Sequence, residues 1–156
     1  LNSTMEQITM LVTNIRTMYG TQGNYNGLTN GSAVDLGIVP AVMDSGSGSG
    51  SARGLTNPFK GDVTISTIGV AATITTTGNT GFSVTYDGLP DEACIALATS
   101  DFGSGAGSGF IGAKLNELTA SGTYGSTTEG NAYSMSTAIG TGGCSGDANS
   151  LTWYFY

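Results

Sequence analysis

The amino-acid sequence predicts an α+β domain in which an N-terminal helix packs as a spine on an antiparallel β-sheet. Three observations predict it: an amphipathic stripe over residues 3–19, alternation of apolar and polar side chains between residues 62 and 87, and an aromatic segment over 151–156 that follows one of two cysteines. At 156 residues, the chain is long enough for one domain with its own core.

The composition indicates an ordered, β-rich domain and not a disordered chain. Charged residues make up 10% of the sequence, and 26 glycines, 23 threonines and 17 serines take the places that lysine and glutamate usually occupy. Such mixtures occur in disordered segments. Here, however, 38% hydrophobic residues, seven tyrosines and the alternating stretches supply enough apolar surface for a folded core.

The charge balance argues against nucleic acid as a partner. Eleven carboxylates against four basic residues give a net charge of −7, which repels nucleic-acid phosphates and anionic lipid headgroups. No apolar run reaches the roughly 20 residues that span a bilayer. The sequence starts at Leu1 without a methionine or a signal peptide, so we interpret it as a processed or truncated product. The four cations are Arg16, Arg53, Lys60 and Lys114.

The sequence lacks the residues of the common catalytic and metal sites. Histidine is absent, which removes the usual general base and the commonest metal ligand. Asp91 and Glu92 are adjacent, would point in different directions on a helix, and are explained as helix-start acids, so they do not predict a hydrolase. We therefore expect no catalytic residue, no metal site and no cofactor. Without a CxxC motif, Cys94 and Cys144 are interpreted as a disulfide that closes about 50 residues.

Residues 3–19 are predicted to form the helical spine. Their apolar side chains recur at steps of three and four, which places them on one stripe of an α-helix, and Gly20 supplies a stop. Ser3 and Glu6 match a capping box that would start the helix at Ser3; alternatively, the match is chance and the helix continues upstream. The stripe consists of Ile8, Leu11, Val12, Ile15, Met18 and Tyr19.

Residues 20–61 are rich in turn signals and predict a long loop. Within it, residues 32–43 are apolar enough to pack against the spine as a short helical or irregular piece, with Ser32 or Asp35 near its start. Residues 44–54, DSGSGSGSARG, have the composition of a flexible tether, and we expect them to be exposed and mobile.

The following region alternates as an antiparallel meander. Residues 62–68 and 70–77 lie on either side of Gly69, which is either a hairpin end or a bulge in one bent strand; the sequence leaves both open. Residues 81–87 alternate cleanly, and we expect them to pair with residues 70–77 through a hairpin at 77–81.

The last third of the chain combines a helix with further strands. A proline and two acids at 90–92 predict the start of a helix that carries Cys94. The glycine-rich stretch 102–110 lacks the preceding strand and the lysine of a P-loop, so it does not predict a nucleotide site. Residues 110–120 fit a strand or a helix. Alternation predicts strands at 132–139 and 150–156.

Several short motifs follow one another in a distinctive order. They are GLTN at 27–30, GIVP at 37–40, NPF at 57–59, FSVTYDGLPDEACIALA at 82–98 and the closing CSGDANSLTWYF at 144–155. In this order and spacing, the sequence resembles the globular domain of type IV pilins over the whole chain. It is most similar to the type IVb branch, and within it to the PilS-type major subunits of bacterial thin pili.

This resemblance implies a type IV pilin-like fold, in which the helical spine packs on an antiparallel β-sheet and a disulfide bounds the C-terminal region. It implies a single globular domain, residues 1–156. Its parts would be the spine (1–19), an αβ loop (20–61), a meander and helix start (62–93), a disulfide-bounded D-region (94–144) and a C-terminal strand (145–156).

The resemblance also implies a structural subunit, not an enzyme, that polymerises non-covalently into a pilus for adhesion, aggregation or conjugative mating contact. Its partners would be other pilin subunits, the pilus assembly machinery and a receptor on a host or recipient cell. The subunit would be stored in the inner membrane and then displayed on the extracellular surface. Such pilins carry an apolar N-terminal helical segment; we expect that it was removed here to give a soluble subunit, which makes the capping-box match incidental.

The expected contact surfaces are the exposed part of the spine and residues 94–144. Arg16 and Lys114 are candidates to meet carboxylates of a neighbouring subunit; the plainer interpretation is that they are solvated surface charges. Two other functions stay open. One is a minor pilin or a secretion pseudopilin of similar fold, although pseudopilins usually lack the disulfide-bounded region. The other is a glycan-binding adhesin, because tyrosine and tryptophan stack on sugars while aspartate and asparagine bind their hydroxyls.

Overall fold

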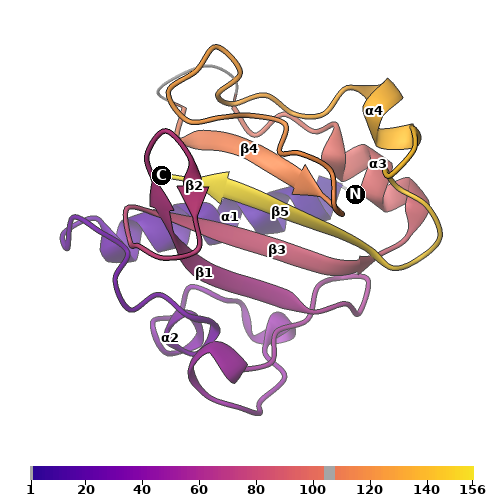
Figure 1. Cartoon of the computed structure of the whole chain (residues 1–156). Coiled ribbons are helices and arrows are strands. Elements are labelled where there is room, and N and C mark those ends of the chain that lie inside the picture. The colour runs from indigo at the N-terminus through magenta and orange to yellow at the C-terminus, as the bar shows by residue number, and fades with distance from the viewer. Residues whose placement is uncertain (1, 104–107) are drawn as a thin grey trace.

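A single long helix lies behind one face of a β-sheet in the computed structural model, which describes residues 2–103 and 108–156 (Figure 1). This helix, α1 (Asn2–Tyr19), is the spine that the periodic stripe predicts. Ser3 lies inside α1, so the helix does not start at Ser3.

The stripe of α1 forms one wall of the core. Ile8, Leu11 and Ile15 are fully buried, and Val12 and Tyr19 are nearly so. Side chains three and four residues apart share one face of a helix, and burying each of these aliphatic groups contributes roughly 1.5–3 kcal/mol. The spine is therefore held to the sheet by apolar contact along its length.

Within the described residues, the sheet has five antiparallel strands in the order β2-β1-β3-β5-β4. The last strand of the chain thus lies in the interior of the sheet, between β3 and β4, and not at an edge (Figure 1). This placement fixes the end of the chain inside the fold. The strands are β1 (Val63–Val70), β2 (Ile74–Thr75), β3 (Gly81–Leu89), β4 (Phe110–Leu115) and β5 (Asn149–Phe155).

Aromatic rings from neighbouring strands fill the core beside α1. Trp153 of β5 is fully buried, and its ring lies 5.5 Å from that of Tyr86 and 5.7 Å from that of Phe102, both edge-on. Phe155 stacks on Phe82 at 5.2 Å. Such pairs add about 0.5–1.5 kcal/mol each beyond the area that they bury. The predicted burial of alternate residues in the last strand is confirmed.

The hairpin predicted between residues 70–77 and 81–87 is wrong. The partner of β3 is β1, with Ser66 opposite Ser83, and residues 74–75 fold back to pair with the end of β1. Residues 62–68 pair with β3 because Val63 and Ile65 are buried in the core, whereas Ala72, in the middle of residues 70–77, is small and exposed.

The αβ loop carries short helices that pack beneath β1. Thr29 is the N-cap of α2 (Asn30–Asp35): its hydroxyl accepts from the Ser32 amide at 3.2 Å, and the Ser32 hydroxyl accepts from the Thr29 amide at 2.8 Å. A short helical piece is present as predicted, but it begins at Asn30 with its cap at Thr29, and Asp35 lies at its end and not near its start. Two 3₁₀ turns follow, η1 (Ala41–Met43) and η2 (Gly50–Ala52).

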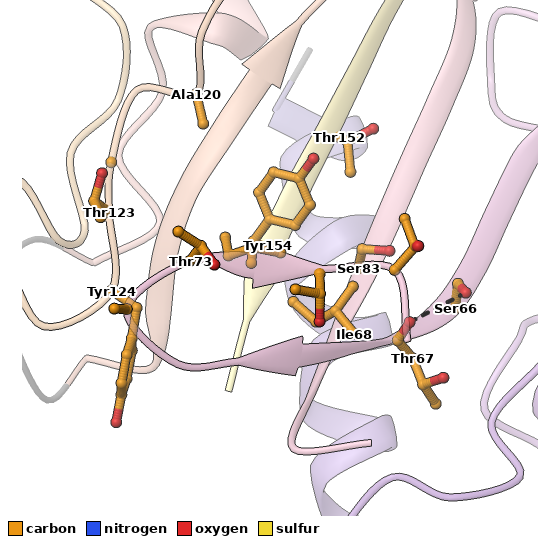
Figure 2. A pocket seen from close by; sticks show the side chains of 15 residues that line it. Ser66, Thr67, Ile68, Thr73, Ser83, Ala120, Thr123, Tyr124, Thr152 and Tyr154 are labelled. Carbon is orange, nitrogen blue, oxygen red and sulfur yellow. Dashed lines mark hydrogen bonds between the residues drawn. The ribbon is translucent and has the colours of Figure 1, made fainter. Parts of the chain in front are cut away.

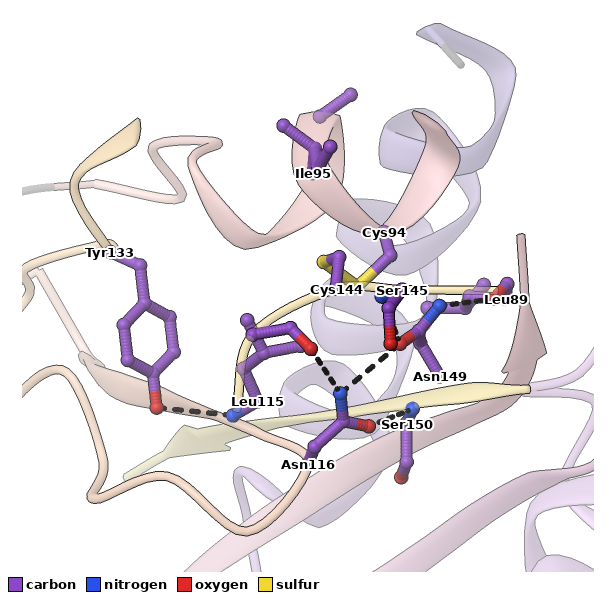
Figure 3. The surroundings of a disulfide bond; sticks show 12 residues. Leu89, Cys94, Ile95, Leu115, Asn116, Tyr133, Cys144, Ser145, Asn149 and Ser150 are labelled. Carbon is purple, nitrogen blue, oxygen red and sulfur yellow. Dashed lines mark hydrogen bonds between the residues drawn. A yellow bond between two sulfur atoms is a disulfide. The ribbon is translucent and has the colours of Figure 1, made fainter. Parts of the chain in front are cut away.

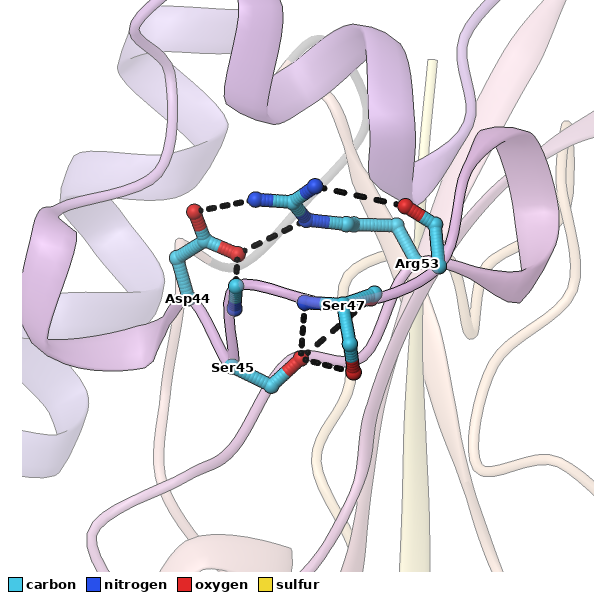
Figure 4. A network of polar contacts seen from close by, with 6 residues as sticks. Asp44, Ser45, Ser47 and Arg53 are labelled. Carbon is cyan, nitrogen blue, oxygen red and sulfur yellow. Dashed lines mark hydrogen bonds and ion pairs between the residues drawn. The ribbon is translucent and has the colours of Figure 1, made fainter.

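Residues 44–54 form a closed loop, which corrects the predicted flexible tether. Arg53 donates from Nε and Nη2 to the two carboxylate oxygens of Asp44, at 2.8 and 2.7 Å (Figure 4). The Ser45 amide donates to the Gly54 carbonyl at 3.0 Å, and the Gly54 amide donates to Ser47. The guanidinium holds the pKa of Asp44 below its ordinary value. The composition correctly predicted that most of residues 44–54 are exposed. It did not predict the bidentate ion pair between Asp44 and Arg53, which joins the two ends of the loop.

Two helices flank the disulfide. The predicted helix is present as α3 (Asp91–Ala98), with its two acids in the first turn. The strand predicted at 132–139 is wrong, because residues 135–139 form the short helix α4 (Met135–Ile139). Ser134 caps it by accepting a hydrogen bond from the Thr137 amide, and this local bond outweighs the alternation.

The remaining open assignments concern residues 102–120. Residues 110–115 form strand β4, which resolves that part of the segment as a strand. Of the glycine-rich stretch that we excluded as a nucleotide site, residues 104–107 lie outside the described residues.

Candidate subunit interface

Apart from Met18 at the end of α1, which is 44% exposed although it was predicted to lie on the buried stripe, the exposed large apolar side chains of the described residues lie on two surfaces. In the αβ loop, Leu36 is 41% exposed and Val42 is 86% exposed. On α4, Met135 and Ile139 are 55% and 59% exposed. Figure 1 shows the αβ loop with α2 below β1, and α4 on the other side of the sheet, beyond β4. Exposed apolar side chains of this size mark interaction surfaces when they gather in patches.

Local structure forces Val42 outward. Pro40 fixes the backbone before η1, and within this one-turn helix Met43 is buried against the core at 1% exposure. Successive residues of a tight helix point to different sides, so Val42 faces solvent while its neighbour anchors the turn. The αβ loop therefore presents an apolar side chain on a fixed backbone.

The geometry of α4 pairs its two exposed side chains. Met135 and Ile139 are four residues apart and lie one turn above the other on the exposed side of the helix, while Ala138 is fully buried. Gly140 caps the C-terminal end. The helix thus turns its small residue inward and its large apolar residues toward solvent.

The disulfide holds α4 in place (Figure 3). Cys94 of α3 is bonded to Cys144, with 5.9 Å between their Cα atoms, and both residues are buried. The Cys144 amide donates to the Ala138 carbonyl at 2.8 Å, which connects the bridge directly to α4. The disulfide and the hydrogen bond between Cys144 and Ala138 therefore tie α4 to α3.

A polar network beneath the disulfide fixes the rest of the D-region (Figure 3). Asn149 donates to the Leu89 carbonyl at 3.0 Å and accepts from the amide of Ser145 and the side chain of Asn116. The Tyr133 hydroxyl accepts from the Leu115 amide at 3.0 Å and donates to a carbonyl at position 119. Burial raises the pKa of Tyr133, which keeps this phenol a donor.

Arg16, predicted as a subunit contact, is bonded within its own chain. Its Nη2 donates to the carbonyls of Gly109 at 3.1 Å and Tyr156 at 2.9 Å. Its guanidinium carbon lies 5.8 and 5.7 Å from the ring centres of Phe82 and Phe155. Arg16 thus ties α1 to the ends of β4 and β5, and a contact with a neighbour stays a prediction.

The other cations have different surroundings. Lys114 lies on β4 opposite Thr152, half-buried, and forms no ion pair with any described residue. Lys60 is exposed in a turn, and Arg53 is paired with Asp44. Lys114 is therefore available to a partner's carboxylate, and its contact with a neighbouring subunit stays a prediction.

The exposed face of α1 carries a shallow hollow of about 410 Å³, lined by Met5, Met10 and polar neighbours. This is the part of the spine face that we expected to meet neighbours. The described residues contain no cluster of three or more His, Cys, Asp or Glu side chains placed to hold a metal ion. None of the helices within residues 2–103 and 108–156 has the length and apolar content needed to cross a membrane.

Comparison with known proteins defines the class. The fold is similar to that of a solved structure, the type IVb pilin from Salmonella typhi, with a TM-score of 0.66 over 98% of this chain and 97% of that chain, at 17% identity. A search of curated protein sequences finds no match. A helical spine on an antiparallel sheet with a disulfide beside it is therefore the fold of a type IVb pilin.

The family follows from the sequence match. The family model described as PilS N terminal matches residues 1–155, so the chain belongs to the PilS family. It is a PilS-type type IVb pilin, a subunit of a type IV pilus. This family and fold are structural and not enzymatic.

The sequence did not predict the exposed residues of this candidate interface. Val42 lies in an apolar run that suggested burial, and the residues of α4 were assigned to a strand. The signal that was available for α4 is local: Ser134 precedes five helix-compatible residues and Gly140 ends them.

Proposed function

We propose that this chain polymerises non-covalently through an unlike pair of surfaces, α4 of one subunit against the αβ loop of the next. The observation that carries the proposal is the exposure of Val42 on one side of the sheet and of Met135 and Ile139 on the other. Contacts between two different patches add subunits in one direction and generate open filaments, whereas a self-complementary patch closes a dimer.

Charge supports the same arrangement. A net charge of −7 per subunit opposes indiscriminate aggregation, while the sparse charges leave surfaces rich in hydroxyl groups that lose little on desolvation. Lys114 is available to a neighbour's carboxylate and would set register more than affinity.

The filament would lie on the cell surface, after storage of the subunit in the inner membrane and extrusion by the pilus assembly machinery. There it would serve adhesion, aggregation or mating contact through a receptor on the other cell. A minor subunit of the same fold is the second candidate. Electron microscopy of sheared surface filaments, with mass spectrometry of their main protein, separates the two: a major subunit dominates the filament mass.

Val42→Asp and Ile139→Asp test the interface itself. Each places an unpaired carboxylate in the proposed apolar contact, so sheared filament mass should fall about tenfold or more. Thr64→Asp on the exposed side of β1 is the matched control and should leave piliation unchanged. All three variants should keep the wild-type melting temperature. Normal piliation by both interface variants would contradict the proposed contact.

A further inference from the structure

A groove of about 420 Å³ lies on the face of the sheet that points away from α1 (Figure 2). Ser66, Ser83 and Tyr154 stand opposite one another on β1, β3 and β5 and form a row across its floor. One wall is the return of residues 72–76, and the other is the segment 120–124. Its volume lies in the range of small-molecule sites, about 300–1,000 Å³.

Glycine makes the second wall possible. Gly112, opposite Tyr154 on β4, has the Gly122 backbone so close that a Cβ on it would meet the Gly122 nitrogen at 2.6 Å. A side chain at either position would push residues 120–124 off the sheet. The close approach therefore builds the groove, and the missing side chain at 112 leaves space beside the ring of Tyr154.

The floor and walls of the groove carry several hydroxyl groups that make no hydrogen bond to any described residue. Ser83 as a residue is only 7% exposed, but its hydroxyl lines the groove and makes no hydrogen bond to any described residue. The hydroxyls of Thr73, Thr123 and Tyr154 also lack protein partners among the described residues. Burial raises the pKa of Tyr154, so its phenol stays a donor at neutral pH. These hydroxyls open onto the groove and have no protein partner among the described residues, so each is free to exchange a hydrogen bond with a ligand.

The remaining surface of the groove is apolar and aromatic. Figure 2 shows the ring of Tyr154 nearly face-on, with Ala120 and Thr73 to its left. Ile68 and Ile74 add aliphatic surface. None of the described residues that line the groove is charged at neutral pH, because they are Ser, Thr, Tyr, Ile, Ala and Gly. A charged ligand would find no counterion there.

We propose that this groove binds a neutral sugar of one or two pyranose rings. The apolar C–H face of a pyranose packs on an aromatic ring, and its edge hydroxyls match donors and acceptors such as Ser83, Thr123 and Tyr154. The groove shares no residue with the αβ-loop or α4 surfaces, so the site is independent of the proposed polymer contact. It would give each subunit of a filament its own sugar site, and repeated weak sites would add to avidity.

The test is an NMR titration of ¹⁵N-labelled, monomeric protein. Lactose, maltose and cellobiose are added up to about 20 mM, above the roughly millimolar Kd expected of a small open site. Sialyllactose serves as the charged comparison. At least one neutral disaccharide should shift the amides of Ser83, Thr123 and Tyr154 in a saturable way, and sialyllactose should bind more weakly.

Substitutions then assign the binding to the groove. Ser83→Ala and Tyr154→Phe each remove one hydroxyl and should weaken binding by about three- to tenfold. Tyr25→Phe removes from the αβ loop a phenol that makes no hydrogen bond to any described residue, and it should leave the affinity unchanged. The proposal is overturned if no neutral disaccharide shifts these amides, if sialyllactose binds as tightly, or if neither groove substitution changes the affinity.

Discussion

At the scale of single residues, buried asparagines replace main-chain partners where strands end. Asn30 lies beside the free edge of β1: its Nδ2 donates to the Val63 carbonyl at 3.0 Å, and its Oδ1 accepts from the Ile65 amide at 2.7 Å. It thereby pairs edge groups that would otherwise invite another strand. Near the end of β3, Asn57 donates to the Asp87 carbonyl and Asn149 of β5 donates to the Leu89 carbonyl.

Asn30→Ala should lower the free energy of unfolding by about 2–4 kcal/mol, because it leaves buried main-chain groups of β1 without partners. Urea denaturation followed by tryptophan fluorescence measures the change, since the tryptophan at 153 is fully buried. Asn26→Ala, an exposed asparagine of the same loop, is the control and should stay within about 0.5 kcal/mol of wild type. If the two variants were equally stable, the hydrogen bonds of Asn30 to β1 would not contribute to the stability of the fold.

The buried phenol of Tyr86 makes stability depend on alkaline pH. Burial raises its pKa above the ordinary value of 10.0, and its hydroxyl donates to Gln7 of α1. Above about pH 10, the unfolded chain releases this proton and the folded chain keeps it, so stability falls by about 1.4 kcal/mol for each further pH unit. Below pH 10 this contribution is fully present.

Melting temperatures measured from pH 8 to pH 11, roughly the span of ordinary tyrosine titration, test this dependence. Wild type should lose stability steeply at the upper end, and Tyr86→Phe, although less stable at neutral pH, should show a shallower fall. Identical slopes for the two proteins would show that another group controls the alkaline transition.

At the scale of elements, the disulfide organises the D-region. It joins α3 to the segment that follows α4 and closes 50 residues, including all of β4. On the chain-entropy account, such a loop stabilises the fold by about 4 kcal/mol. The same bridge determines where the exposed side chains of α4 stand.

The double variant Cys94→Ala with Cys144→Ala should therefore unfold with about 4 kcal/mol less free energy than wild type. Its amide exchange should accelerate most over residues 134–144, which the bridge anchors. Wild type reduced under native conditions is the matched comparison and should behave alike. If the free energy of unfolding fell by less than about 1 kcal/mol, the hydrogen bonds of Asn149, and not the disulfide, would be the main source of stability in this region.

Elements were predictable from the sequence where local pattern and burial agree. The stripe of α1 and the alternation of β3 and β5 satisfy both, so these elements were found with nearly correct bounds. The strand predicted at 132–139 was wrong because the hydrogen bond of the cap at Ser134 favours a helix over the strand that the short alternation indicates. The partner of β3 was predicted wrongly because residues 62–68 and 70–77 are both rich in threonine, and only their contacts with the core decide which stretch pairs with β3.

The sequence did not predict the candidate interface or the groove, and the reason is different. Val42 is exposed because its neighbour Met43 is buried, a result of one tight turn that no periodicity records. The groove exists because residues 72–76 and 120–124 fold over the same sheet face, and these segments are far apart in the chain. The composition predicted surfaces rich in hydroxyl groups, but it did not predict that these two segments meet over one face of the sheet.

At the scale of the whole molecule, surfaces with different tasks are separated. The spine and the core rings face one side of the sheet, the sugar groove lies on the other, and the apolar side chains of the αβ loop and α4 lie beyond its two edges (Figure 1). A filament built through the edges would leave the groove on each subunit accessible. Low charge and fixed loops suit a subunit that repeats one contact many times.

Cysteine cross-linking in intact filaments tests the central claim most directly. The variant carrying both Val42→Cys and Ile139→Cys is expressed in cells that make the pilus, and sheared filaments are oxidised and examined on denaturing gels. We expect a ladder of covalent oligomers, because each subunit presents one new thiol to each neighbour, while either single variant stays monomeric. Filaments of the double variant that yield only monomers after oxidation would contradict the proposed contact between α4 and the αβ loop.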